Sequence, residues 1–166
     1  GWHQYAQTTF QQQLPPWLDE GLATTMEGFR IRRGTLVFTA DSNRERLYRL
    51  REAARNNSLI PLNELLEGDP HEFLSQGKSK LLTYYAQVWA MARFLTEGEN
   101  GRYLPSLQMV LILAVEGDLY RQLLRSDTSG RHSLTPGEVT GRVLVEAFFN
   151  DDFEAFTASY DAYVLE

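Results

Sequence analysis

Apolar residues recur every three or four positions along most of the chain, which is the spacing of helices that bury one face. The clearest example is residues 80–97, where the apolar positions form one broad stripe. The same spacing predicts helices over residues 2–13, 16–29, 44–56, 63–66, 102–115, 119–125, 135–149 and 152–164. The 102–115 helix is apolar on most sides, so we expect it to be largely buried. The pattern therefore predicts a mainly α protein.

Proline and strand-forming residues mark the points where the helical pattern is interrupted. Pro15 and Pro16 separate the first two helices, because proline fits only the first turn of a helix. Residues 30–40 combine strand-forming side chains with an Arg-Gly turn, which favours a short β-hairpin. Thr135 is followed by proline and then glutamate at the spacing of a helix start. We expect one helical domain over residues 1–166, with at most this short hairpin.

The net charge of the chain argues against negatively charged partners. Sixteen basic against 22 acidic residues give a net charge of −6, whereas nucleic acids and anionic membranes attract clustered basic faces. We therefore expect neither as the main partner. The longest apolar run, Met109 to Val115, is too short for a membrane span of roughly 20 residues. No basic and then apolar leader opens the chain, so we expect no signal peptide. With no cysteine, the sequence excludes disulfides, thiolate ligands and a cysteine nucleophile.

Two of the three histidines lack the neighbours that metal binding needs. His71 is followed by glutamate, but Ser75 stands where a helical His-Glu-x-x-His motif requires its second histidine. His132 lies in a polar stretch between arginine and serine. We interpret both as structural or solvated loop residues.

The third histidine, His3, lies in a different sequence context. It lies on the first predicted helix, and the prolines that end this helix are followed by the string Trp-Leu-Asp-Glu-Gly-Leu-Ala at residues 17–23. This combination resembles the gluzincin zinc metallopeptidases, and more specifically the bacterial peptidase-MA-like domains, many of them domains of unknown function. Later segments are similar to that family only through general apolar patterns.

The resemblance implies a set of zinc ligands. In the family these are the two histidines of His-Glu-x-x-His and a glutamate on the following helix, and the glutamate of the motif is the general base. His3 matches the second histidine, Glu20 matches the third ligand, and Gly1 and Trp2 match the variable positions. The first histidine and the base would immediately precede Gly1. The chain then looks like the C-terminal helical lobe of a catalytic domain.

The chemistry of catalytic zinc is consistent with this layout. Residues four apart on a helix share a face, so a histidine four positions before His3 would project beside it. Catalytic zinc uses three protein ligands and one open position, and it lowers the pKa of bound water towards about 7. Asp19 and Thr24 flank Glu20 and are candidates to hydrogen-bond a ligand. Tyr84 and Tyr85 are candidates for oxyanion stabilisation, as the resemblance implies.

Two functions follow from this sequence. In the first, the parent protein is a zinc peptidase, and the chain alone neither hydrolyses peptides nor holds zinc tightly, because one ligand and the base are missing. In the second, it is a non-catalytic helical binding module, scaffold or pseudoenzyme descended from such peptidases, with His3 a surface residue and Glu20 a partner of the helix dipole. The residues before Gly1 distinguish the two. The resemblance also favours an extracytoplasmic bacterial parent.

A lobe separated from the rest of its domain exposes apolar surface. We expect that surface on the first two helices, around Trp2, Tyr5, Trp17 and Leu18. Such a patch would favour self-association through this face.

Overall fold

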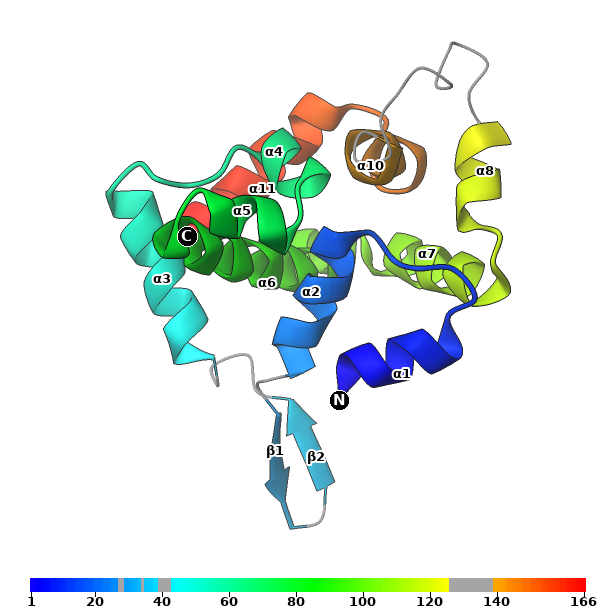
Figure 1. Cartoon of the computed structure of the whole chain (residues 1–166), viewed down its shortest axis with the longest axis horizontal. Coiled ribbons are helices and arrows are strands. Elements are labelled where there is room, and N and C mark those ends of the chain that lie inside the picture. Colours follow the sequence, from blue (N-terminus) through cyan, green and yellow to red (C-terminus); the bar gives the residue numbers. More distant parts are fainter. Residues whose placement is uncertain (27–28, 34, 39–42, 126–138) are drawn as a thin grey trace.

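The computed structural model of the chain is mainly α-helical and carries one small β-hairpin (Figure 1). It describes residues 1–26, 29–33, 35–38, 43–125 and 139–166. The helices are α1 (Trp2–Thr9), α2 (Pro16–Met26), α3 (Arg44–Arg55), α4 (Leu62–Glu67), α5 (Pro70–Ser75), α6 (Lys78–Gly101), α7 (Leu104–Glu116), α8 (Leu119–Arg125), the π-helical segment η3 (Val139–Val143), α10 (Leu144–Phe148) and α11 (Phe153–Leu165). The predicted mainly α fold class is confirmed.

The longest helix, α6, is the element around which the others pack. Helices α2, α3, α5, α7 and α11 all contact it (Figure 1). Its middle is buried on nearly every side, with Tyr84, Val88 and Phe94 fully enclosed. The backbone leaves helical geometry at Gly98 and the two residues after it. The interval between the predicted helices 80–97 and 102–115 is therefore a kink near the end of α6.

A glycine allows α2 to approach α6 closely. A Cβ atom placed on Gly21 would lie 2.7 Å from the backbone oxygen of Val88 and 3.4 Å from the Cβ of Ala92. Real Cβ atoms do not approach a backbone oxygen so closely, so only glycine fits at this crossing. The glycine of the Trp-Leu-Asp-Glu-Gly string thus seats α2 on the core helix, with Glu20 adjacent to the contact.

The hairpin projects away from the helices (Figure 1). Strand β1 (Phe29–Arg32) pairs antiparallel with β2 (Thr35–Phe38), and Phe29 lies opposite Phe38. Arg33 at the turn has a φ of 51°, a value typical of tight hairpin turns. The hairpin lies in the segment for which the sequence predicted it.

Two helix predictions need correction. The first helix ends at Thr9 rather than near residue 13, because Phe10 is extended and the next residues bond to other elements. Residues 70–75 form a helix, so His71 is an exposed helical residue and not a loop residue. Asp69 caps this helix by accepting a hydrogen bond from the Glu72 amide. The predicted start at Thr135, like His132, lies outside the described residues.

Two predictions of exposure are also wrong. Trp17 and Leu18 are only 1% exposed, because α2 packs directly on α6 and the Trp17 indole donates a hydrogen bond to the carbonyl of Thr140. The expected apolar face of the first two helices is therefore smaller than predicted. By contrast α7 is not largely buried, since Met109 is 49% and Ile112 51% exposed.

Across the described part of the chain, no helix is both long and apolar enough to cross a membrane.

Candidate functional site

Helices α1 and α2 bring together the two predicted ligands. The Nε2 atom of His3 lies 3.8 Å from a carboxylate oxygen of Glu20. The other ring nitrogen, Nδ1, lies 3.1 Å from a carboxylate oxygen of Asp19. The His3 side chain is about half exposed, and the two carboxylates are roughly three-quarters covered. One imidazole thus meets two carboxylates at the edge of the fold.

Asp19 holds the ring of His3 in its orientation. One oxygen of Asp19 meets His3 Nδ1, and the other accepts a hydrogen bond of 2.6 Å from the indole nitrogen of Trp2. A carboxylate on Nδ1 favours the tautomer with the proton on Nδ1 and the lone pair on Nε2. The lone pair then points to the side on which Glu20 lies.

The connection between the two helices is fastened to the far end of the fold. The backbone amide of Gln12 donates to the carbonyl of Ala114 on α7, and its side-chain oxygen accepts from the amide of Tyr120 on α8. The Tyr120 hydroxyl donates to the carbonyl of Gln13. These bonds position α1, which itself has no buried residue.

The distance between the two ligand atoms suits a shared metal ion. Zinc binds a histidine nitrogen and a carboxylate oxygen at about 2.1 Å each, so tetrahedral geometry separates the two atoms by about 3.4 Å. The observed 3.8 Å between His3 Nε2 and Glu20 exceeds that separation by a few tenths of an ångström. Two side chains are fewer than the three that catalytic zinc requires. Among the described residues, no group of three or more His, Cys, Asp or Glu side chains is arranged to hold a metal ion.

The predicted hydrogen-bonding partners of the ligands differ in where they point. Asp19 reaches His3, as described. Thr24 is buried, and its hydroxyl donates to the carbonyl of Gly21 in its own helix at 2.7 Å. The side chain of Thr24 is thus engaged within α2, and of the two candidates the structure brings Asp19 to the histidine.

Tyr84 is a buried residue of α6, and the charge of Glu20 affects its pKa. Its side chain is fully buried and stacks on Phe73 with 4.6 Å between ring centroids. No described residue is a hydrogen-bond partner for its hydroxyl. Burial, and next the negative charge of Glu20, raise the pKa of Tyr84 far above its ordinary value. Tyr84 is therefore a neutral phenol at any working pH and retains a proton to donate.

Tyr85 has a different environment from its neighbour. Its ring is half-buried, it contacts the ring of Tyr84 edge-on at 5.5 Å, and the guanidinium of Arg46 lies 5.2 Å from its centroid. Arg46 belongs to α3, so Tyr85 faces that helix.

A small cavity of about 330 Å³ adjoins the histidine. His3 and Asp19 line it, together with apolar Ala6, Phe10 and Leu14 and the side chains of Gln7, Gln12 and Gln13. Its lining combines uncharged amides with an apolar floor. Its volume lies at the lower end of the range of small-molecule sites, and it is large enough for one side chain of a bound peptide.

Sequence reasoning missed Trp2 as a site residue. Trp2 occupies a variable position of the motif, so the pattern gave no signal that its indole would bond to Asp19.

The comparisons with known proteins add no relative. No family model matches the chain, and no curated protein and no solved structure matches it.

Proposed function

We propose that the chain is the helical lobe of a gluzincin-type zinc peptidase, in which His3 and Glu20 are two of the three protein ligands. The observation that carries the proposal is the approach of His3 Nε2 to the Glu20 carboxylate at 3.8 Å, while Asp19 takes Nδ1. A ligand histidine whose second nitrogen bonds a carboxylate is a recurrent arrangement in zinc proteins.

Each described residue has a defined task in this proposal. Zinc, when bound, lowers the pKa of a bound water to about 7 and polarises the peptide carbonyl. His3 presents a neutral nitrogen, and Asp19 keeps the proton on the opposite nitrogen. Glu20 supplies negative charge. Tyr84 is assigned the role of oxyanion donor that the resemblance implies, and this role requires its buried hydroxyl to become accessible to the substrate.

The remaining ligand, which is the first histidine of the motif, and the general base are assigned to residues that precede Gly1. Helix α1 begins at Trp2, with Gly1 as its N-cap. If the helix continued backwards, a histidine four positions before His3 would share its face. A glutamate three positions before His3 would be the base. The motif thus requires the order His-Glu-Gly1-Trp2-His3.

A second candidate function is a non-catalytic module, and one observation favours it. The bonds from Trp2 and His3 to Asp19 fasten α1 onto α2, so both residues have a structural use that requires no metal. In that case the segment would be a helical scaffold derived from a peptidase. The two candidates differ in what the loss of His3 changes: metal affinity in the first, and only the docking of α1 in the second.

The test restores the motif and measures zinc affinity. One chain carries Ala-Ala-His-Glu before Gly1, and its control carries Ala-Ala-Ala-Glu. We expect the first to bind zinc on the order of a hundredfold more tightly in a chelator competition, because an additional ligand completes the set. His3→Ala and Glu20→Gln in the extended chain should each remove the gain. His71→Ala, on exposed α5, should retain it.

Three results would contradict the proposal. The first is equal zinc affinity of the His-Glu chain and its control. The second is a gain that survives His3→Ala or Glu20→Gln. The third is about one tightly held zinc per molecule in the unextended chain, because two ligands do not hold zinc tightly. If His3→Ala instead loosens α1 without any effect on zinc, the scaffold function is supported.

A further inference from the structure

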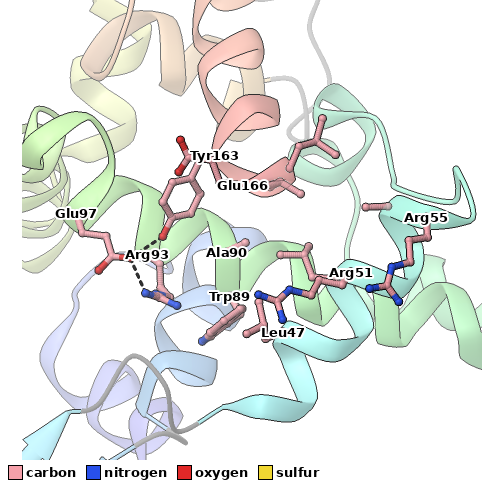
Figure 2. A pocket seen from close by; sticks show the side chains of 13 residues that line it. Leu47, Arg51, Arg55, Trp89, Ala90, Arg93, Glu97, Tyr163 and Glu166 are labelled. Atoms are coloured by element: carbon pink, nitrogen blue, oxygen red, sulfur yellow. Dashed lines mark hydrogen bonds and ion pairs between the residues drawn. The ribbon is translucent and has the colours of Figure 1, made fainter.

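Helices α3, α6 and α11 line a groove (Figure 2), and its lining contains none of the residues of the candidate metal site. Its volume is about 620 Å³, within the usual range of small-molecule sites. The floor is apolar and well packed: Leu50, Trp89, Ala90 and Val164 are each less than a tenth exposed. None of the residues that line it belongs to α1 or α2.

One end of the groove is internally neutralised. Arg93 and Tyr163 both bond to the same oxygen of Glu97, each at 2.6 Å (Figure 2). The Arg93 guanidinium also lies 5.1 Å from the ring centroid of Trp89. The charges of Arg93 and Glu97 cancel there, so this end has little attraction for an ion.

The other end carries two guanidinium groups that are not neutralised. Arg51 and Arg55 are exposed, stand one turn apart on α3, and extend on the side away from Glu97 (Figure 2). Neither forms an ion pair or hydrogen bond with another described residue. Because Arg93 is paired with Glu97, Arg51 and Arg55 are the arginines of the lining that can bond to an anion. The chain as a whole has a net charge of −6, so two exposed arginines without an acidic partner among the described residues run against the overall balance.

We propose that this groove binds a small molecule that combines an apolar body with a single carboxylate. The carboxylate would bond to Arg51 and Arg55, because guanidinium groups match carboxylates in geometry and charge. The apolar body would cover Leu47, Leu50 and the edge of Trp89. A single carboxylate has two oxygens and can bond to both guanidinium groups, and the volume suits a ligand of small-molecule size.

The test uses two probes of the same shape, 4-phenylbutyrate and its neutral amide 4-phenylbutyramide. Binding is measured by titration calorimetry and by the amide shifts of α3 and α11. We expect 4-phenylbutyrate to bind about tenfold more tightly than the amide, which is the contribution of a charge-assisted hydrogen bond. Arg51→Gln/Arg55→Gln should weaken 4-phenylbutyrate about tenfold and leave the amide unchanged.

The control keeps the net charge equal. Arg121→Gln/Arg125→Gln changes two exposed arginines on α8 and should bind 4-phenylbutyrate like the unaltered chain. The His3→Ala variant should also bind 4-phenylbutyrate normally. The test of the groove is therefore independent of the test of the metal site. Equal binding of acid and amide, no binding of either, or equal weakening by both double variants would overturn the proposal. So would binding of a Gly-Leu-Phe peptide through its carboxylate without binding of 4-phenylbutyrate.

Discussion

Helices α1 and α2 each supply one candidate ligand, but α2 is packed into the core and α1 is not. Trp17 and Leu18 of α2 are fully buried, and Gly21 brings the helix into backbone contact with α6. Helix α1 has no buried residue and is held by side-chain bonds and by its connection. The position of Glu20 is therefore set by the core, whereas that of His3 is set by a few polar contacts at the surface.

This difference has a consequence for any metal at the site. Polar contacts at an exposed edge are each worth about 1 kcal/mol, so α1 can detach at much lower cost than α2. A metal that joins His3 to Glu20 would stabilise the looser helix against the fixed one. Metal affinity should therefore depend on how firmly α1 is docked.

The largest expected effect comes from forcing α2 off the core helix. Gly21→Val places a side chain 2.7 Å from the Val88 oxygen, so α2 must move outwards. We expect a loss of about 3 kcal/mol in the free energy of unfolding, measured by urea denaturation. Gly1→Val is the control, since nothing lies within 4 Å of a Cβ there, and it should change stability by less than about 0.5 kcal/mol. Similar values for both variants would show that α2 is not seated as described.

A smaller effect is expected from the ionisation of Tyr84, which is buried on α6 and whose pKa the charge of Glu20 on α2 helps to raise. Its folded-state pKa lies above the ordinary value of 10.0, so the native state keeps the proton longer than the unfolded state does. Stability from Tyr84 is complete below pH 10 and is lost as the pH rises further. Between pH 10 and 12, the unaltered chain should lose about 1.4 kcal/mol more per pH unit than Tyr84→Phe.

The measurement is urea denaturation of both proteins at several alkaline pH values. Parallel pH profiles would mean that Tyr84 is accessible to solvent in the folded state, which contradicts its burial on α6. Both proteins retain the other tyrosines, so the contributions of those tyrosines to the pH dependence cancel when the two free energies of unfolding are subtracted.

The smallest effect is expected at the looser helix. Trp2→Phe removes the hydrogen bond to Asp19 but keeps an aromatic ring in place. We expect hydrogen exchange of the α1 amides to accelerate about fivefold, equivalent to about 1 kcal/mol, while the α2 amides are unaffected. Tyr5→Phe is the matched control, because the Tyr5 ring is 56% exposed. If exchange accelerated equally in α1 and α2, the two helices would be one unit and not two.

The parts of the fold that the sequence predicted are those with local signals. Asn43 caps the start of helix α3, because its side chain accepts a hydrogen bond from the Arg46 amide. Asp152 caps α11 in the same way, by accepting a hydrogen bond from the Ala155 amide. The spacing of apolar residues also identified α6. The juxtaposition of His3 and Glu20 followed the motif, although their role as metal ligands stays a prediction.

The parts that the sequence did not predict depend on contacts between distant segments. The end of α1 is set by bonds from Gln12 to α7 and α8, about a hundred residues away. Periodicity could not show that Met109 and Ile112 of α7 lack a partner. The groove beside Arg51 needs three helices that the sequence keeps far apart. Helix α5 is the exception, because Asp69 and Pro70 formed a local start signal that was overlooked.

The most direct test of the central claim is to determine which nitrogen of His3 takes zinc. Nitrogen NMR of the imidazole, in the chain extended by Ala-Ala-His-Glu, follows both ring nitrogens during a zinc titration. We predict a large shift at Nε2, a retained proton at Nδ1 on Asp19, and loss of the shift in Glu20→Gln. Zinc at Nδ1, or no change at His3 while the added histidine responds, would contradict the account.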